Sequence, residues 1–588
     1  MTFPGELRLE SGDRLSGITV AYETYGELSP NRDNAILICH ALTGDSHVAQ
    51  HDENDDPGWW DLVVGPGKSI DTDRYFVICP NVLGGCRGTT GPNSINPATG
   101  RPHAADFPAI TVGDIVEVQR RLVDHLGIER LMAVIGGSLG GFMVLTWATQ
   151  FPHRVGSAVA LATSPRLTSQ ALAFDVVGRN AILRDPAYQN GQYYDEGHGP
   201  VVGLAIARML GHITYLSREA MMQKFDSQRQ QPRDVQTQFE TKFSVGSYLA
   251  YQGDRFGERF DANSYVTLTT AIDLFNLGDT PDKLKATLDR SRCRWLLVSY
   301  SSDWLFPPFQ SREIVDNLIA LNKPVSYCNV ETDCGHDAFL LPNQLPVYGG
   351  LVRAFLEHVP NTDLSNSESE SKELPASVAG ATERKSIFHR RRLDYETILE
   401  LIPPTASVLD LGCGTGGLLA RLRDRGHHRE AGLVGVEYDE QLVLACVRRG
   451  LDVVQADLNK GLASFADGQF DVVVLSQTLQ TVTDVSRVLH DMLRVGRQGI
   501  VSFPNLAHRK LRVQLAEQGR APQVQAECGF HWHNTPYVRS LSIADFEQFC
   551  REQGFTIHRE IALDTEADTQ VAEDPNLNAD VAVVVLSK

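Results

Sequence analysis

An α/β fold arranged in two domains is predicted by three features of the 588-residue sequence. Short apolar runs typical of buried strands alternate with amphipathic runs typical of helices. Two glycine-rich turns, at residues 136–141 and 412–417, each follow an apolar run and precede a helical one. Between the two turns, residues 361–386 are rich in Ser, Glu, Ala and Thr and nearly lack large apolar side chains. Such a segment cannot bury enough surface to offset its ordering entropy, so it predicts a linker.

The composition limits the kinds of partner that the chain can have. Its net charge of -19 argues against nucleic acid or an anionic membrane, because both need a basic surface. No apolar run is long enough to span a bilayer, and the N-terminus lacks the basic and apolar segments of a secretory signal. We therefore expect a soluble cytoplasmic protein with reduced cysteines and with neither a nucleic-acid nor a membrane partner.

The first domain, residues 1–360, has the pattern of a mostly parallel sheet covered by helices. Continuous runs rich in β-branched or aromatic residues predict strands buried on both faces, at 35–39, 75–79, 131–135, 155–161, 295–299 and 325–330. Residues 110–126 and 140–151 predict helices between them. From about residue 165 to 288 the strands stop and helical segments take over. An insertion of that size predicts a lid over the active site.

A serine among four glycines interrupts the apolar pattern. Gly136-Gly137-Ser138-Leu139-Gly140 lies between a strand and a helix, which is the pattern of the nucleophile elbow in the α/β-hydrolase fold. We expect Ser138 to adopt a strained turn with a positive φ and an exposed hydroxyl. The backbone N–H of Leu139 then points toward a developing oxyanion, and the N–H of Leu42, after strand 35–39, is the candidate second donor.

A serine nucleophile needs a base, and the base needs an orienting acid. In this fold the chain order is Ser, then Asp or Glu, then His. Asp303 follows strand 295–299 and His336 follows strand 325–330, so both are expected at the sheet edge where Ser138 lies. The alternatives are that Asp303 caps the helix predicted over 309–321 and that His336 is a surface-loop histidine.

Several histidines and acids crowd the loop after residue 46. They are His47, His51, Asp52, Glu53, Asp55 and Asp56. They show no recognised ligand spacing, so a solvated loop is the favoured interpretation and no metal is expected.

Six motifs of the first domain together resemble the homoserine O-acyltransferases of the MetX type. They are HALTGD (40–45), SIDTDRYFVICPNVLGGCRGTTGP (69–92), GGSLGG (136–141), ARMLGHITYLS (207–217), SDWLFPP (302–308) and GHDAFL (335–340). The resemblance implies a homodimer of methionine biosynthesis in which Ser138 takes an acyl group from acyl-CoA and passes it to L-homoserine. It implies that Arg208 and Asp337 hold homoserine, and that acyl transfer needs no cofactor. An esterase or thioesterase is the alternative, since only the acceptor differs.

The acyl donor depends on one position. In relatives that prefer succinyl-CoA, the residue two after the catalytic aspartate is characteristically arginine, and here that position is Leu305. An unpaired buried carboxylate costs several kcal/mol. Acetyl-CoA is therefore the expected donor and succinyl-CoA the alternative.

The second domain, residues 387–588, begins with a strand that ends in a glycine-rich turn. The predicted ligand-contacting residues are Asp410, Gly412, Gly414 and Gly416 in this turn, with Glu437 and Asp457 at the ends of the next two strands. Such glycines let the backbone approach a ligand at a sheet edge. Glu437 is placed for ribose hydroxyls, and Asp457 lies near the expected position of an adenine amine.

This arrangement resembles the class I S-adenosylmethionine methyltransferase fold, a Rossmann-like domain. The segments VLDLGCGTG, VGVEYD, ADLNKGL, FDVVVLSQTLQ and VSFPNLAHRKLR resemble the methionine biosynthesis protein W (MetW) family. The resemblance implies that the domain binds S-adenosylmethionine, and a supporting or regulatory role is favoured because a tether raises effective concentration. The alternative is an active methyltransferase, although no dedicated substrate motif such as N-P-P-Y is present. His531-Trp532-His533 is interpreted as aromatic packing.

Overall fold

The computed structural model describes residues 1–197, 199–225, 244–359, 392–426, 432–519 and 538–588. The chain forms two compact units. The first comprises Met1–Lys323 and Asn329–Ser367, and the second comprises Pro324–Cys328 and Glu368–Lys588. Strand β11 (Val325–Val330), which was predicted, crosses this division. The expected linker and the predicted aromatic cluster at 531–533 lie outside the described residues.

The first unit is built on a sheet with the strand order β10-β9-β8-β4-β7-β3. All neighbouring pairs are parallel except β3 and β7, which are antiparallel. The strands are β3 (Tyr22–Tyr25), β4 (Ala35–Cys39), β7 (Phe76–Pro80), β8 (Leu131–Gly137), β9 (Val155–Leu161) and β10 (Arg294–Tyr300). The side chains of β4, β8 and β10 are buried throughout, as the continuous apolar runs predicted. Two small pairs lie outside this sheet, β1 (Glu6–Arg8) with β2 (Arg14–Ser16) and β5 (Val64–Gly65) with β6 (Ile70–Asp71).

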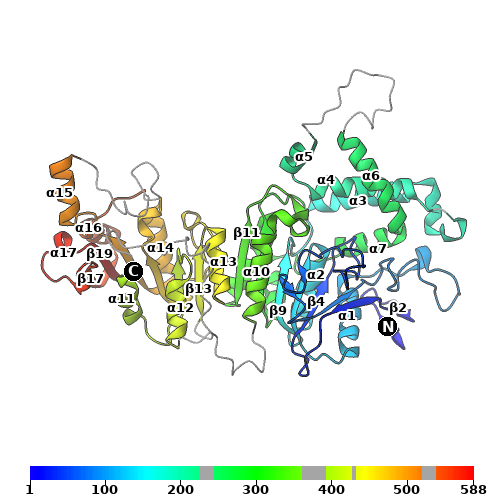
Figure 1. Cartoon of the computed structure of the whole chain (residues 1–588), viewed down its shortest axis with the longest axis horizontal. Helices are drawn as coiled ribbons and strands as arrows, with labels where there is room; N and C mark the ends of the chain where they lie inside the picture. Colours follow the sequence, from blue (N-terminus) through cyan, green and yellow to red (C-terminus); the bar gives the residue numbers. More distant parts are fainter. Residues whose placement is uncertain (198, 226–243, 360–391, 427–431, 520–537) are drawn as a thin grey trace, which may run out of the picture. The chain divides into compact units, whose positions relative to one another are not determined.

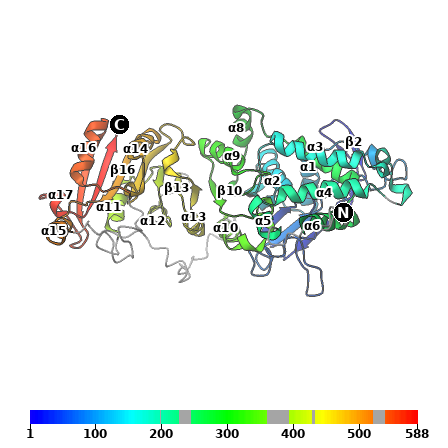
Figure 2. The ribbon, with the colours of Figure 1, turned by 90° about the horizontal axis from the view of Figure 1, so that it is seen from above.

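Four helices pack on this sheet, and the sequence predicted all of them except α10. They are α1 (Val112–His125), α2 (Leu139–Gln150), α9 (Pro308–Ala320) and α10 (Leu345–Glu357). A capping box starts α1, in which the Thr111 side chain accepts the Asp114 N–H and the Asp114 carboxylate accepts the Thr111 N–H. Figure 2 shows α9 and α10 on opposite sides of β10. No helix within the described ranges is long and apolar enough to cross a membrane.

Helices and short turns make up the described residues between β9 and β10, the region where a lid was expected. They are α3 (Ser169–Leu183), α4 (Val201–Tyr215), α5 (Arg218–Phe225), α6 (Ser244–Arg259), α7 (Ala262–Asp273) and α8 (Pro281–Asp289). Helix α4 packs against both α3 and α6, and the three helices lie together (Figure 1). The chain breaks between α4 and α5 because Leu216 is extended and the Ser217 hydroxyl accepts the Ala220 N–H.

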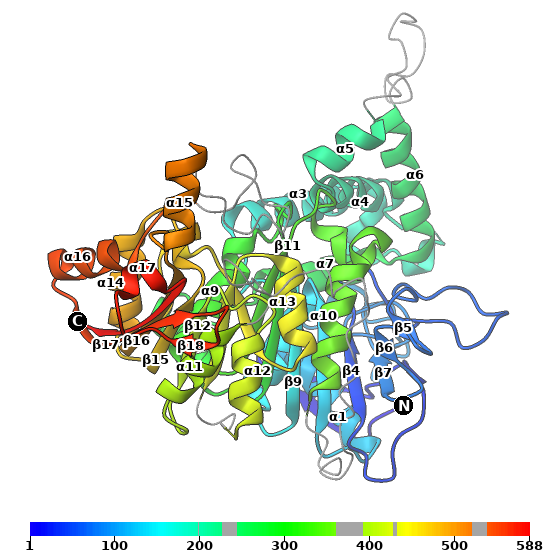
Figure 3. The ribbon, with the colours of Figure 1, turned by 60° about the vertical axis from the view of Figure 1, so that its left-hand side comes forward.

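The second unit has a sheet with the order β14-β13-β12-β15-β16-β19-β17-β18. The first five strands are parallel, whereas β19 and β17 run antiparallel to their neighbours. The strands are β12 (Val408–Leu411), β13 (Leu433–Glu437), β14 (Asp452–Gln455), β15 (Phe470–Ser476), β16 (Gly496–Pro504), β17 (Thr556–Asp564), β18 (Thr569–Gln570) and β19 (Val581–Ser587). The helices are α11 (Leu393–Leu401), α12 (Gly417–Asp424), α13 (Glu440–Arg448), α14 (Val485–Val495), α15 (Arg509–Gln518), α16 (Ile543–Gln553) and α17 (Pro575–Asn578). Helix α16 packs against both β17 and α17 (Figure 3).

Candidate active site

Ser138 lies in the turn between β8 and α2 with φ 59° and ψ -124°. A positive φ is uncommon for a residue with a side chain, and the energetic cost of such a conformation is of order 1–3 kcal/mol. The predicted strained turn is therefore confirmed. It leaves Ser138 half-buried at the sheet edge, while Leu139 begins α2 directly behind it.

The glycines around Ser138 are explained by close backbone approach. A Cβ at Gly140 would lie 2.1 Å from the carbonyl oxygen of Cys39, and one at Gly136 would lie 2.6 Å from the Gly140 backbone. Larger residues would therefore push α2 away from β4 and β8. Because the elbow is so tight, α2 starts immediately after the serine, and the Leu139 N–H belongs to the first helical turn, where it has no intrahelical partner.

Ser138, His336 and Asp303 form a continuous hydrogen-bonded relay. His336 Nε2 lies 2.9 Å from Ser138 Oγ, and His336 Nδ1 lies 2.8 Å from Asp303 Oδ2. His336 and Asp303 are both buried, with 2% and 3% of their surface exposed. The surface-loop alternative for His336 is therefore wrong. The geometry is that of a serine activated by an imidazole whose tautomer is fixed by a carboxylate.

Asp303 is fixed by the backbone around it. Its Oδ1 accepts the N–H groups of Leu305 and Phe306 at 3.0 and 2.9 Å, which leaves Oδ2 for His336. Helix α9 starts after Pro307, so the alternative of Asp303 as its cap is wrong. Burial alone would lower the pKa of His336, but the charge and hydrogen bond of Asp303 outweigh it and raise that pKa.

The predicted oxyanion donor Leu42 lies in a turn just beyond β4. The Gly44 N–H donates to the Ala41 carbonyl at 3.0 Å and closes this turn around Leu42. His40, which is buried, supports the turn, because its Nδ1 contacts the Ala41 carbonyl at 2.8 Å and its Nε2 accepts the Val82 N–H at 3.2 Å. Leu42 and Ser138 line the same pocket.

Arg208 on α4 and Asp337 beside His336 are the two predicted homoserine-binding residues. Arg208 Nη1 donates to Thr43 Oγ1 at 3.4 Å, which places the guanidinium at the oxyanion turn. Its guanidinium carbon lies 4.8 Å from the centre of the Phe256 ring. Burial raises the pKa of Asp337 to about 6, although His336 and Arg208 act to lower it. A cation and an acid thus flank the relay.

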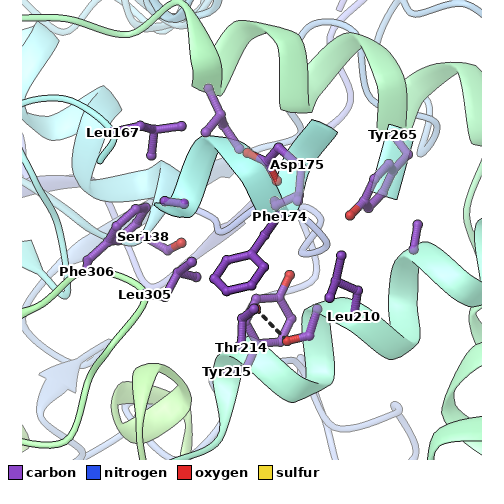
Figure 4. Close-up of a pocket in the computed structure, with 15 residues that line it drawn as sticks. Ser138, Leu167, Phe174, Asp175, Leu210, Thr214, Tyr215, Tyr265, Leu305 and Phe306 are labelled. Atoms are coloured by element: carbon purple, nitrogen blue, oxygen red, sulfur yellow. Dashed lines mark hydrogen bonds between the residues drawn. The ribbon is translucent and has the colours of Figure 1, made fainter. Parts of the chain in front are cut away.

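A pocket opens at Ser138 beneath the lid helices (Figure 4). Its walls are largely apolar, and Leu305 is one of its lining residues. The residues that line it are Leu42, Ser138, Leu167, Ala171, Phe174, Asp175, Ala207, Leu210, Gly211, Thr214, Tyr215, Tyr265, Ile272, Leu305 and Phe306. None of these described lining residues is Lys or Arg.

Asp175 is a pocket residue that the sequence did not single out. It lies on α3, and burial, with Asp273 beside it, raises its pKa to about 8. Arg179 pairs with Asp273 and so joins α3 to α7. An acid within the apolar run ALAFDVV was the available signal, but only packing of the lid helices brings it into the pocket that Ser138 also lines.

In the second unit, the glycine-rich turn follows β12 as predicted. Gly412, Gly414 and Gly416 have φ values of 70°, 60° and 74°, so the turn needs residues without side chains. Glu437 ends β13, and its Oε2 accepts the Gly414 N–H at 2.8 Å. Its Oε1 accepts the Tyr438 N–H at 2.8 Å. The glutamate therefore holds the loop in shape.

The two other predicted acids of this unit lie in different surroundings. Asp410 is buried within β12, and burial raises its pKa to about 7, although Arg392 acts to lower it. Asp457 lies two residues beyond β14, which ends at Gln455, and its Oδ1 accepts the Asn459 N–H at 2.9 Å as the cap of a short 3-10 helix. The predicted strand end lay two residues too far, because the paired register with β13 stops at Gln455 and only the Ala456 N–H still donates to the Glu437 carbonyl, at 2.9 Å.

Each of the two units matches a different family of known proteins. Residues 34–342 match the family model of the alpha/beta hydrolase fold, and residues 392–586 match that of methionine biosynthesis protein MetW. The bifunctional methionine biosynthesis protein MetXA/MetW of Rhodopirellula baltica is 51% identical over 100% of this chain and 93% of its own. A homoserine O-acetyltransferase of Methanohalobium evestigatum is 50% identical over 69% of this chain and 80% of its own. A homoserine O-succinyltransferase of Alkalilimnicola ehrlichii is 51% identical over 61% of this chain and 94% of its own.

Two solved structures resemble the first unit. Homoserine O-acetyltransferase from Bacillus anthracis has a TM-score of 0.55 and 30% identity, covering 60% of this chain and 96% of its own. Esterase E22 has a TM-score of 0.55 and 29% identity, covering 60% of this chain and 98% of its own. Acyl transfer and ester hydrolysis therefore both occur among the structural neighbours.

The parallel sheet, the elbow at Ser138 and the buried relay define the first unit as an α/β-hydrolase-fold enzyme. The match over the full length is more specific. The chain belongs to the family of bifunctional MetXA/MetW proteins of methionine biosynthesis.

Proposed function

We propose that the first unit transfers an acetyl group from acetyl-CoA to the hydroxyl of L-homoserine. The observation that carries this function is the relay of Ser138, His336 and Asp303 beneath the lid, with a cation and an acid beside it. The relatives named as homoserine O-acetyltransferases support the choice of substrates.

In the first half of the reaction, Ser138 Oγ attacks the thioester carbonyl while His336 Nε2 takes its proton. The backbone N–H groups of Leu42 and Leu139 are the proposed donors to the oxyanion. The intermediate collapses, the C–S bond breaks, and His336 returns the proton to the departing CoA thiolate. Asp303 keeps the proton of neutral His336 on Nδ1 and stabilises the imidazolium that forms.

In the second half, the homoserine hydroxyl attacks the acetyl-serine. His336 takes the hydroxyl proton and returns it to Ser138 Oγ as the new ester leaves. Arg208 suits the substrate carboxylate because a guanidinium binds it through two N–H groups, and Asp337 suits the ammonium. Binding at these two charges holds the hydroxyl in place of a water molecule, which favours transfer over hydrolysis.

Peptide mapping after mixing the protein with acetyl-CoA alone tests the mechanism. We expect one acetyl group on the peptide that carries Ser138. Acetylation of a cysteine instead, with Ser138 unmodified, would contradict the proposed nucleophile.

We propose acetyl-CoA as the donor because the pocket at Ser138 offers a succinyl carboxylate no cationic partner among its lining residues. Leu305 faces this pocket and Asp175 is its acidic member. Burying the carboxylate of a succinyl group there without a cationic partner would cost several kcal/mol. We expect kcat/KM to favour acetyl-CoA by about a hundredfold or more. The succinyltransferase among the relatives makes the comparison of both donors necessary, and equal rates would show that Leu305 does not decide the donor.

For the second unit, we infer binding of S-adenosylmethionine or its demethylated product. In the order β14-β13-β12-β15-β16, the chain adds strands on one side of β12 up to β14 and then on the other side from β15 to β16. The boundary between β12 and β15 is therefore a topological switch point. Ligands of such sheets bind there, beyond the carboxyl ends of the strands. The glycine-rich turn after β12 and Glu437 at the end of β13 lie at that edge. This supports a methyltransferase-like Rossmann domain, and a supporting or regulatory role is favoured over methylation.

Calorimetry on the full chain tests the nucleoside proposal. Heat is expected with S-adenosylmethionine or S-adenosylhomocysteine, and no heat with either would contradict it. Methyl transfer to a protein or small-molecule acceptor would favour the alternative, an active methyltransferase.

A further inference from the structure

Three metal-ligating side chains converge outside the Ser138 site. Glu23 lies on β3, while His47 and His51 lie in the loop between β4 and β5. One donor atom from each lies within 4.8 Å of the others. His47 Nδ1 and His51 Nε2 both lie 3.0 Å from the same oxygen, Glu23 Oε2. Within the described part of the chain this is the one such group of three.

The hydrogen bonds of His47 show which of its two ring nitrogens carries a hydrogen when the imidazole is neutral. His47 Nε2 lies 2.7 Å from the Asp56 carbonyl oxygen, which can only accept, so Nε2 carries the hydrogen. In the neutral imidazole, Nδ1 then directs a lone pair at the Glu23 carboxylate. Two acceptors at 3.0 Å are stable only with a proton or a cation between them. A proton on Nδ1 satisfies this contact in the empty cluster, and a cation that displaced this proton would take the same lone pair.

The surrounding groups orient all three side chains. The Tyr25 hydroxyl donates to Glu23 Oε2 at 2.8 Å, and its ring stacks on His51 with centroids 4.4 Å apart. The Ser46 hydroxyl donates to Glu23 Oε1 at 3.2 Å. The bond from His47 to a backbone carbonyl is the arrangement that fixes metal-bound histidines in proteins. The cluster thus has an outer shell of its own.

We propose that Glu23 Oε2, His47 Nδ1 and His51 Nε2 form a binding site for a divalent cation of the zinc class. Two imidazoles and one carboxylate match the ligands that Zn²⁺ takes, whereas Mg²⁺ and Ca²⁺ prefer oxygen alone. Neighbouring ligands around tetrahedral zinc are roughly 3.3 Å apart, given bond lengths of about 2.0–2.1 Å. The observed separations of 3.0 Å from Glu23 are close to this value.

The position of the site indicates its consequence. His47 and His51 belong to the loop after β4 that also carries Leu42, the proposed oxyanion donor, and Glu23 belongs to the edge strand β3. A bound cation would tie this loop to β3 and so stabilise it against local opening. We therefore expect a structural role, and binding itself does not depend on the acyl-transfer proposal.

The test is metal binding by the full chain after removal of metal with a chelator. At about pH 8, where free imidazoles are neutral, titration with Zn²⁺ should give one equivalent with a Kd below about 10 µM, and Mg²⁺ should not bind. Co²⁺ should give the intense visible bands of a four-coordinate site. Elemental analysis after gel filtration should find one zinc per chain.

Three variants decide whether these residues are the ligands. Glu23→Gln, His47→Ala and His51→Ala should each weaken Zn²⁺ binding about 10-fold or more. His153→Ala, which removes an exposed histidine elsewhere, is the matched control and should bind as the parent does. The melting temperature of each variant without metal shows whether it is folded. Absence of stoichiometric Zn²⁺ binding, or equal binding by a folded His51→Ala variant, would overturn the proposal, whatever the acyltransferase activity.

Discussion

Asp303 of the first unit and Glu437 of the second unit use their carboxylate oxygens differently. Asp303 in the first unit gives one oxygen to two backbone N–H groups and directs the other at His336, which in turn reaches Ser138. In the second unit, both carboxylate oxygens of Glu437 accept backbone N–H groups, one from Gly414 and one from Tyr438. The first arrangement prepares a reactive atom, and the second shapes a loop. The difference teaches that similar glycine-rich turns after a strand can have different surroundings, a hydrogen-bonded relay in the first unit and a loop held by a carboxylate in the second.

The largest expected effect is the loss of activity in Ser138→Ala. Removal of the nucleophile should lower kcat for acetyl transfer by about 10⁴-fold or more, because the acyl group then has no carrier. Ser169→Ala, at the exposed start of α3, is the matched control and should keep full activity. Nucleoside binding by the second unit should be the same in both variants. Activity within tenfold of the parent in Ser138→Ala would contradict the assigned chemistry.

The next effect concerns the acid of the relay. Asp303→Asn should lower kcat by about 10³–10⁴-fold because the wrong imidazole tautomer is favoured. In the parent, Asp303 raises the pKa of His336, which must be neutral to act as a base. Activity should therefore fall as the pH drops through a pKa above the usual value of about 6.5. In Asp303→Asn this acidic limb of kcat/KM should move to lower pH, and an unchanged limb would assign it to another group.

A smaller effect is expected at the donor pocket. Leu305→Arg supplies the cation that the lining lacks, so kcat/KM for succinyl-CoA relative to acetyl-CoA should rise by about 10- to 100-fold. Leu305→Met keeps the volume and apolarity of the side chain and should leave the ratio nearly unchanged. If both variants have the ratio of the parent, the donor is chosen elsewhere in the pocket.

The smallest effect is expected in the second unit. Glu437→Gln keeps the shape of the side chain but weakens its bonds to the Gly414 and Tyr438 N–H groups, and it would weaken the proposed bonds to ribose hydroxyls. Affinity for S-adenosylmethionine should fall about 10-fold, about 1.4 kcal/mol. Acyl transfer should not change. Glu400→Gln, exposed on α11 of the same unit, is the control for loss of charge. A parallel loss of acyl transfer in Glu437→Gln would show that the contrast between chemistry and binding is wrong.

The sheet of the first unit was predictable because its strands are continuous apolar runs with clear ends. The bounds of β4 and β9 match the expected ones, and β10 differs by one residue at each end. Ser138 could be found because the elbow needs glycines at fixed spacing. Asp303 and His336 followed from strand ends and chain order. These features are local in sequence or follow from the rule that parallel strands end at one edge.

The features that the sequence did not predict depend on packing between distant segments. Asp175 reaches the pocket only because the lid helices fold over the sheet. Glu23 joins His47 and His51 because β3 pairs with β7 at the edge of the sheet, and nothing in the loop sequence indicates that pairing. In the second unit, Asp457 lies beyond the end of β14 because the strand ladder stops at Gln455. The sequence did not show which elements pack beside each other in the first two cases, or where strand pairing ends in the third.

The release of CoA from acetyl-CoA, followed in time with and without L-homoserine, tests the central claim most directly. An acyl-serine that awaits homoserine predicts a rapid burst of one CoA per chain in buffer alone, followed by almost no further release. Adding homoserine should then restore continuous turnover. Continuous release at the same rate in buffer alone would show that water is the acceptor, and would contradict the claim that the first unit is a transferase.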